Sequence, residues 1–462
     1  MPTTERLPKP LRAGVSSTSI TPPAGVAIQG YDVRYSEGTT DPLLISALAV
    51  GGPRVTWILL SVDCIGLDRD FTARVRQTLD RRLGLPAAAI TIACSHTHSG
   101  PATLRQLGPV TADSAYLAIL EERLVTVATA AVENMQPARW RFGVESLPEN
   151  VNRRVRTARG VELGVNPRGP VDTRLRVLRI DRASVAPDGP PLALVVHYTC
   201  HATTSGGMSR VSADWPGAMR GTLQGVYGET GREPIVCFLQ GCTGDVTHRV
   251  GRDRDAWPAH FGESSSVQSQ ILGRLVAAAA LSASERSVEV RAEAVQTSVE
   301  PVELSFRDSP GGERTEIQVV RVGPGPAPGR ARSAAASIWF VGLPGEPFTA
   351  YSTELGRQWS RRLGVPSERV VVCGYTNDCV GYLCTPKALR EGGYEAAAAH
   401  RVYHRPSPFA ANTQRRVFAA ALRAAGTIAD GKLGRAHSIV AAACNVLDRW
   451  ISLRSRVYGG SR

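Results

Sequence analysis

The chain has 462 residues, of which 43% are hydrophobic and 21% charged, which is typical of one large or two ordinary globular domains. No apolar run approaches the roughly 20 residues needed to cross a bilayer, which argues against a transmembrane segment. The formal net charge is +13, but the basic residues are spread along the chain with no basic stripe alternating with aromatics, which disfavours nucleic-acid binding.

All but three of the 54 basic residues are arginine, and this content together with abundant Ala, Gly and Pro is typical of a GC-rich genome. The charge therefore favours an anionic substrate or a generally solvated surface. The first residues lack the basic region and apolar stretch of a secretory signal, so we expect a cytoplasmic protein.

The nine cysteines include no Cys-x-x-Cys pair, and most lie in or beside apolar runs. This pattern is typical of reduced thiols in a core and not of a disulfide framework. Cys200 and Cys242 adjoin the motifs described below, so a role in the site stays open for them.

Short apolar runs alternate with helical periodicity along most of the chain. Runs rich in Val, Ile and Leu predict buried strands at 55–62, 89–93, 192–196, 235–239, 338–341 and 370–372. Apolar positions at helical spacing predict helices at 71–83, 115–134, 271–283 and 348–363. The alternation predicts an α/β fold, with a mixed β-sheet core covered by helices and the active site at the carboxyl ends of the strands.

Two later stretches differ from this pattern. Residues 288–305 alternate between apolar and polar side chains, which predicts partly exposed strands. Apolar side chains form a helical stripe over 436–453, which packs on its own domain or serves as a homo-oligomer interface. We therefore expect a main domain, residues 1–432, followed by a C-terminal amphipathic helix and tail, residues 433–462.

The segment from Ile90 to Pro101 carries the first chemical motif. An apolar run leads into His96 and His98 and then stops at Ser-Gly-Pro. Side chains two residues apart in a strand point the same way, so both imidazoles are expected to face one point at the strand end. Because imidazole is the commonest metal ligand and an acid or base near neutral pH, the spacing predicts a metal site with a catalytic neighbour.

Polar side chains also follow the later strands, at the end where open α/β sheets bind ligands. These side chains are His197, His201 and Asp214 after the second strand, Gln240, Asp245, Thr247 and His248 after the third, Glu346 after the fourth, and Asn377 and Tyr382 after the fifth. We expect His197 to be an ordinary strand residue and His201 a site residue. For His248 two positions are equally expected, either the protein surface or the rim of a pocket.

The order of the motifs is distinctive. The pieces are Ile20-Thr-Pro-Pro, Ser95-His-Thr-His-Ser-Gly-Pro, Asn152-Arg153, Cys200-His201, Gln240-Gly-Cys-Thr-Gly-Asp, Pro344-Gly-Glu346 and Gly381-Tyr382. Across roughly residues 10 to 430 this set resembles the catalytic domain of the neutral/alkaline (non-lysosomal) ceramidase family, as a divergent bacterial member. Each motif alone is weak, and their shared order carries the resemblance.

The resemblance implies one zinc ion and the residues that hold it. The implied ligands are His96, His201, Glu346 and Tyr382. Imidazole nitrogen and carboxylate oxygen suit Zn²⁺, and a catalytic site keeps a position open for water. Phenolate is a less usual ligand, so chemistry alone supports Tyr382 least.

Further roles follow from the same resemblance. It implies that His98 donates to the substrate carbonyl or its oxyanion, and that Arg153 lies beside the same oxygen. Tyr394 occupies the position of an aromatic hydroxyl that lines the site, although a packing role is the simpler interpretation. Asp214 is expected to orient a metal ligand.

Two departures from the family pattern affect the expected function. Thr247 and His248 stand where the family has serine and proline, and the sequence ends without the β-sandwich domain of the full-length ceramidases. Threonine keeps a hydroxyl but its β-methyl restricts the rotamer, so we expect metal-activated water as the nucleophile. The expected substrate is a small N-acyl compound rather than ceramide.

The sequence thus predicts a zinc-dependent amidohydrolase acting on C–N bonds other than peptide bonds. An acyltransferase or amide-forming enzyme on the same zinc centre is one alternative. A catalytically silent binding protein on this scaffold is the other, and the threonine at 247 is the one feature in its favour.

Overall fold

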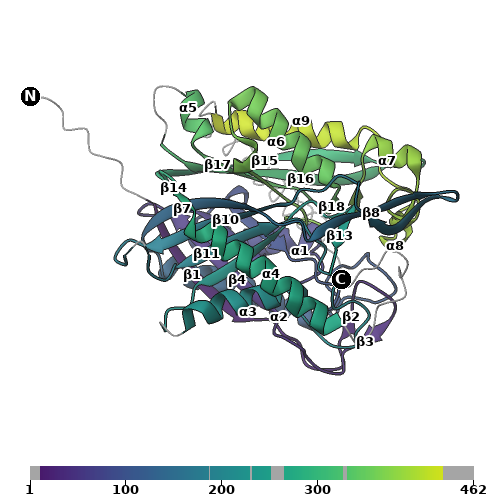
Figure 1. Cartoon of the computed structure of the whole chain (residues 1–462), viewed down its shortest axis with the longest axis horizontal. Coiled ribbons are helices and arrows are strands. Elements are labelled where there is room, and N and C mark those ends of the chain that lie inside the picture. Colours follow the sequence, from purple (N-terminus) through teal and green to yellow (C-terminus); the bar gives the residue numbers. More distant parts are fainter. Residues whose placement is uncertain (1–10, 187, 229–230, 251–264, 326–329, 430–462) are drawn as a thin grey trace, which may run out of the picture.

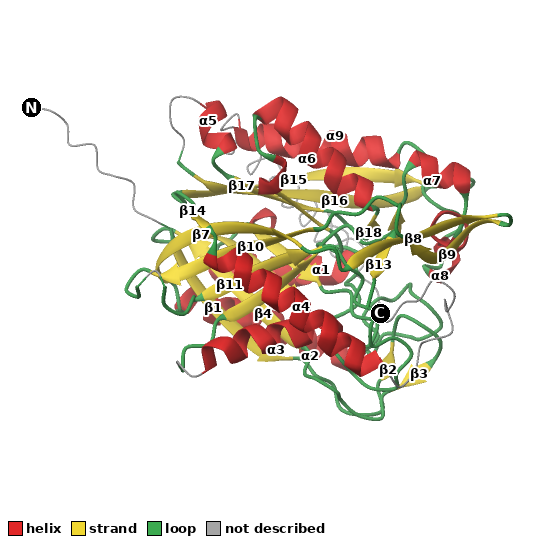
Figure 2. Cartoon of the chain, in the orientation of Figure 1, coloured by secondary structure: helices red, strands yellow, loops and turns green. Residues whose placement is uncertain are grey.

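The computed structural model describes residues 11–186, 188–228, 231–250, 265–325 and 330–429. Two β-sheets lie face to face, and helices cover the outer face of each, so the molecule has four layers (Figures 1 and 2). The predicted C-terminal helix over 436–453 lies outside the described residues. The expected α/β architecture is confirmed, but the core contains two stacked sheets and not one.

The larger sheet is mixed. Its strand order is β12-β11-β10-β7-β1-β4-β5-β6, with β14 also paired to β7. The outer pairs β11–β12 and β5–β6 are parallel, and the central pairs are antiparallel. The strands are β1 (Arg12–Ser19), β4 (Leu44–Gly51), β5 (Val55–Val62), β6 (Ile90–Cys94), β7 (Gln136–Ser146), β10 (Arg174–Arg182), β11 (Ala193–Tyr198), β12 (Ile235–Gln240) and β14 (Val288–Glu289).

The second sheet has the order β15-β16-β17-β19. Its strands are β15 (Ala294–Ser305), β16 (Gly312–Gly323), β17 (Ile338–Gly342) and β19 (Val370–Cys373). The first three are antiparallel, and β17 and β19 are parallel. The partly exposed strands expected over 288–305 are present as β14 and β15.

Strand alternation explains how both faces of each sheet become buried. In β5, Ile58 and Leu60 pack toward the helices, whereas Trp57 and Leu59 pack toward the second sheet. Val371 of β19 meets them from the other side. Because side chains alternate across a strand, a run that is apolar at every position fits a sheet covered on both faces.

Helices of the predicted kind cover the two outer faces. The larger sheet is covered by α1 (Arg69–Leu83), α2 (Ser114–Glu133), α3 (Asp214–Gly228) and α4 (Ser265–Glu285), and the second sheet by α5 (Arg330–Ala335), α6 (Thr349–Leu363) and α9 (Thr413–Ala429). The four predicted helices correspond to α1, α2, α4 and α6. None of the helices in the described ranges has the length and apolar character that a membrane crossing requires.

Short elements gather at one end of the stacked sheets (Figure 1). The strands among them are β2 (Ala27–Ile28), β3 (Arg34–Tyr35), β8 (Asn150–Thr157), β9 (Gly160–Asn166), β13 (Val246–His248), β18 (Glu346–Pro347) and β20 (Tyr382–Leu383). The short helices of the chain are η1 (Ala87–Ala89), η2 (Ser367–Arg369), α7 (Pro386–Glu391), the π-helix η3 (Tyr394–Ala398) and α8 (Ala399–Val402). β13, β18 and β20 follow the carboxyl ends of β12, β17 and β19, which is where the sequence placed the site.

Candidate metal centre

Three histidines from two strand exits form a buried cluster. His96 and His98 follow β6 and His201 follows β11, and one ring nitrogen of each lies within 4.8 Å of those of the other two. The Nε2 atoms of His96 and His98 are 3.1 Å apart. The expected convergence is therefore present, but β6 ends at Cys94 and His96 has φ 63°, so a left-handed turn produces it and not strand alternation.

The hydrogen bonds of the three rings fix which nitrogen carries the proton. Each Nδ1 lies near a backbone carbonyl oxygen: His96 to Ile65 at 2.6 Å, His201 to Thr243 at 3.0 Å and His98 to Gly30 at 3.1 Å. A carbonyl can only accept, so each Nδ1 donates and each Nε2 of a neutral ring presents a lone pair. Burial lowers the pKa of His98 and of His201 well below the usual value, which keeps both rings neutral.

One of these nitrogens has no hydrogen-bond partner among the described residues. The Nε2 atom of His201 is buried and accepts no hydrogen bond from them. An unpaired buried acceptor costs on the order of 1–3 kcal/mol, so such an atom needs an explanation. A cation at the centre of the cluster supplies one.

Glu346 brings a negative charge to the same point. Its Oε2 atom lies 3.4 Å from His96 Nε2 and 3.5 Å from His201 Nε2. Burial alone would raise the pKa of the Glu346 carboxyl, but His96 and Tyr403 lower it to about 2, so the group is ionised. Three of the four ligands implied by the sequence are therefore assembled.

Tyr382 enters the site through the short sheet that carries Glu346. The two residues are direct partners in the parallel β18–β20 pair. Arg153 of β8 donates from Nη2 to the Tyr382 hydroxyl at 2.9 Å, and from Nε to Glu395 at 2.8 Å. Burial alone would lower the pKa of the Arg153 guanidinium, but Tyr382 and Glu395 raise it well above its usual value.

The remaining predicted residues lie at different depths around the cluster. Thr247 is buried in β13, next to Val246, whose carbonyl oxygen is 3.2 Å from His201 Nδ1. Tyr394 lies edge-on to Tyr382, with ring centroids 5.9 Å apart, and burial raises the pKa of its phenol to about 12. Tyr394 therefore lies beside Tyr382, and Thr247 lies near His201 through the backbone of β13.

Asp214 does not contact an imidazole. Its carboxylate accepts hydrogen bonds from the backbone of Ser205 and of Trp215, at 2.5 and 2.7 Å, and from the Thr204 hydroxyl. Trp215 in turn donates from Nε1 to the His201 carbonyl at 3.1 Å. Asp214 thus supports the loop that follows His201, and it is linked to that residue indirectly, through Trp215.

Neither a model of a known protein family nor a curated protein matches the sequence. Among solved structures, the neutral ceramidase from Pseudomonas aeruginosa superposes with a TM-score of 0.72 at 15% identity, over 91% of this chain and 75% of that one. A ceramidase complexed with C2 superposes with a TM-score of 0.71 at 15% identity, over 91% of this chain and 76% of that one.

The chain has the neutral ceramidase fold. The fold implied by the ordered motifs is thereby confirmed, at an identity too low to be found by comparing whole sequences. Within this ceramidase fold, the residues that the motifs single out meet at one end of the stacked sheets, as described above.

Several residues of the site belong to no motif that the sequence analysis used. Tyr403 donates to Glu346 Oε1 at 2.5 Å, and Glu395 pairs with both Arg153 and Arg154. Tyr375 stacks on the His96 ring with centroids 4.0 Å apart. Only Tyr375 had a signal in the sequence, because it lies in the polar turn after a predicted strand.

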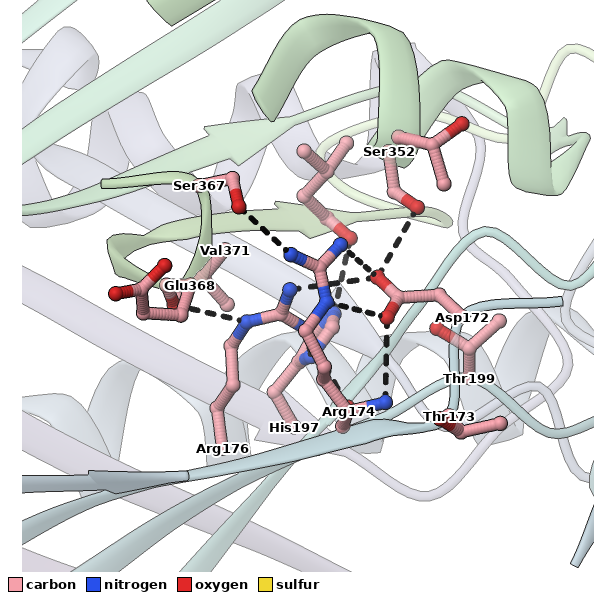
Figure 3. A network of polar contacts seen from close by, with 12 residues as sticks. Asp172, Thr173, Arg174, Arg176, His197, Thr199, Ser352, Ser367, Glu368 and Val371 are labelled. Carbon is pink, nitrogen blue, oxygen red and sulfur yellow. Dashed lines mark hydrogen bonds and ion pairs between the residues drawn. The ribbon is translucent and has the colours of Figure 1, made fainter. Parts of the chain in front are cut away.

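The other two histidines flagged by the sequence have no place in the cluster. His248 lies in β13 with its Nδ1 2.9 Å from the Val250 carbonyl oxygen. His197 lies in β11 and belongs to a separate network with Arg176 and Asp172 (Figure 3). Cys200 and Cys242 are buried, reduced thiols, and burial raises the pKa of Cys242 well above its usual value.

A large cleft near the site is distinct from the cluster. It has a volume of about 1160 Å³ and lies between the β8–β9 hairpin and helices α6, α7 and α9. Arg154 and Asp245 line it, but the three clustered histidines, Glu346 and Tyr382 do not. The cleft therefore carries no argument about the ligand of the metal centre.

Proposed function

We propose that the chain is a zinc-dependent hydrolase that cleaves the amide bond of a small N-acyl compound. The observation that carries this proposal is the convergence of three imidazole Nε2 atoms and one carboxylate oxygen in a buried space. Two unprotonated nitrogens 3.1 Å apart repel each other unless a cation or a proton lies between them, and the rings hold their protons at Nδ1. The ceramidase fold adds support for amide chemistry.

His96, His201 and Glu346 would hold the ion, with Tyr382 as the fourth ligand. Imidazole nitrogen and carboxylate oxygen are donors that Zn²⁺ prefers in catalytic sites. Burial raises the pKa of Tyr382 well above its usual value and Arg153 opposes only part of that effect, so a bound cation would be needed to hold the phenolate. Zinc in this position would supply Lewis acidity toward a water molecule and toward the acyl carbonyl oxygen.

His98 is assigned the role of general base. Its Nδ1 proton is donated to Gly30, and burial keeps the ring neutral, so Nε2 can accept the proton that an attacking water loses. Gly30 itself has φ 121°, and a Cβ atom there would come within 2.7 Å of the His98 ring. The role implied by the sequence, donation from His98 to the substrate oxygen, would need an imidazolium, which burial disfavours.

Arg153 is assigned to the developing oxyanion. Its Nε and Nη2 atoms are held by Glu395, Tyr382 and the Gly244 carbonyl, whereas Nη1 makes no hydrogen bond within the described part of the chain. A fixed cation beside the acyl oxygen stabilises a tetrahedral intermediate. The leaving amine takes its proton from Tyr394, whose ring lies beside Tyr382, or from Thr247.

The substrate class rests on the fold and on one substitution. The solved neighbours are named ceramidases, which favours an N-acyl amide and extends the class to lipid-like amides. Thr247 at the position of the family serine favours a compound other than ceramide itself. The expectation of an anionic group on the substrate rests only on the net charge of the chain.

The deciding experiment measures metal and product together. Purified protein is expected to hold one zinc ion per chain and to release free acid from a panel of N-acyl amines, and the His96→Ala variant should lose both properties. A matched control is His404→Asn, which changes an exposed histidine at φ 50° to a residue that tolerates this backbone.

The same assay separates the two alternatives. If a conjugate accumulates when an acyl donor and a free amine are supplied, while amides are not hydrolysed, the chain is an acyltransferase. Protein that binds no zinc and turns over neither reaction would be a silent binding protein.

A further inference from the structure

A single segment of the chain contacts three of the predicted site residues from outside. Residues 394–403 comprise the π-helix η3, α8 and the turn after it. We propose that this segment positions Glu346 through Tyr403, an inference that rests on the proposed function, in which Glu346 is a zinc ligand. The sequence motifs assign nothing to Tyr403.

The two oxygens of Glu346 are used differently. Oε1 accepts a hydrogen bond from the Tyr403 hydroxyl at 2.5 Å, and Oε2 faces the Nε2 atoms of His96 and His201. An O–H···O⁻ bond of this length is among the strong, charge-assisted hydrogen bonds of proteins. Tyr403 therefore fixes the rotation of the carboxylate and leaves one oxygen, Oε2, directed at the cluster.

Tyr403 is itself held from several sides. It is 3% exposed, and its hydroxyl is 3.8 Å from Cys379 Sγ. Its ring packs against Gly381, where φ is +96° and a Cβ atom would come within 3.2 Å of the ring. Gly381 also accepts a hydrogen bond at 2.9 Å from the backbone N–H of Glu346. The spacing between Glu346 and Tyr403 thus depends on one glycine that touches both.

The start of the same segment holds a different part of the site. The Glu395 side chain is 1% exposed and pairs with Arg153 at 2.8 Å and with Arg154 at 2.6 Å. Its backbone belongs to a π-helix, a turn type that recurs at functional sites. Glu395 reaches the cluster only through Arg153, so it provides a matched way to disturb the segment without touching Glu346.

The test compares zinc affinity in three variants by competition with a chromophoric chelator. Tyr403→Phe removes the hydroxyl and keeps the ring, and zinc affinity should fall about 10- to 100-fold, as for other residues that orient a metal ligand. Glu395→Gln should bind zinc within about threefold of the wild type. Tyr351→Phe, which changes a buried tyrosine that donates to Cys384, should bind zinc as the wild type does.

Each result either supports or overturns the assignment. Weaker zinc binding in Tyr403→Phe alone, with the thermal midpoint of the metal-free protein unchanged, supports it. Unchanged zinc affinity in Tyr403→Phe overturns it, and so does an equal loss in Tyr403→Phe and Glu395→Gln, which would indicate general damage to the segment. A wild type that binds no zinc would instead overturn the proposed function and this assignment together.

Discussion

His197 and His201 are four residues apart, both buried, and in opposite chemical settings. His197 donates from Nε2 to the Val372 carbonyl at 3.0 Å, and its Nδ1 lies 3.3 Å from the Arg176 guanidinium, which can only donate (Figure 3). His201 donates from Nδ1, and its Nε2 has no hydrogen-bond partner among the described residues. Both residues are buried histidines, so the unsatisfied Nε2 atom is what distinguishes His201 as the candidate metal ligand.

The charged groups around His197 also pair with one another. Asp172 accepts from Arg174 at 2.7 and 2.9 Å and from Ser352 of α6 at 3.3 Å, and it pairs with Arg176 at 3.3 Å. It joins the larger sheet to the helical layer over the second sheet (Figure 3). A network whose members satisfy one another needs no ligand, and we interpret it as structural.

The largest effect should come from His201→Ala. Loss of a ligand with an unpaired nitrogen is expected to abolish zinc binding and to lower activity by about 10⁴-fold, since metal activation supplies several kcal/mol of the barrier. The folding free energy of the metal-free protein should change little. Elemental analysis and amide hydrolysis measure the first two, and zinc retained at one ion per chain would contradict the ligand assignment.

Asp172→Ala should show the reverse pattern. Removing one partner of a buried ion pair leaves Arg176 uncompensated, and we expect a loss of about 3–5 kcal/mol of unfolding free energy. Zinc stoichiometry in the protein that remains folded should stay at the wild-type value. Urea unfolding is the measurement, and equal stability to the wild type would show that the network is dispensable.

Two further variants, His98→Ala and Tyr382→Phe, test which residue of the site binds zinc and which acts as the base. His98→Ala should retain zinc and lose about 10²- to 10⁴-fold in kcat, the usual contribution of a general base. Tyr382→Phe should weaken zinc binding instead. If His98→Ala loses the metal and Tyr382→Phe keeps it, His98 is a ligand and the base lies elsewhere.

The pH dependence of stability should separate His197 from the cluster. Burial, followed by Arg176, lowers the pKa of His197 to about 3, whereas an unfolded histidine titrates near 6.5. The unfolded chain therefore binds more protons between these values, and stability from this group is lost as the pH falls from about 6.5 to 3, by at most about 1.4 kcal/mol per pH unit. Urea unfolding of metal-free His197→Gln should show a shallower decline over this window, and an identical slope would refute the neutral assignment.

Thr247→Ala should have the smallest effect. If water is the nucleophile, loss of the hydroxyl should reduce kcat less than about tenfold, which corresponds to under about 1.4 kcal/mol. Thr247→Ser is the control that restores the family residue. A loss above a thousandfold in the alanine variant, rescued by serine, would make the hydroxyl the nucleophile.

The sequence predicted those features that local pattern determines. His96, His201 and Glu346 each follow an apolar strand, and the resemblance carried by the ordered motifs singled them out as ligands. Their strands lie far apart in the larger sheet and in the second sheet, so their meeting depends on the tertiary fold. Two stacked sheets were not predicted, since a strand such as β5 is apolar at nearly every position and periodicity cannot say what covers each face. Tyr403 and Glu395 were missed because they lie in a helical segment whose contacts depend on tertiary packing.

Four residues near the strand exits adopt positive φ values between 50° and 63° without being glycine. They are His96, Asp214, Tyr375 and Asn377. Each such backbone costs on the order of 1 kcal/mol. At His96, selection for heat resistance and selection for turnover would therefore act in opposite directions. A library scored only by melting temperature would enrich glycine at His96 and discard the imidazole on which the proposed metal site depends.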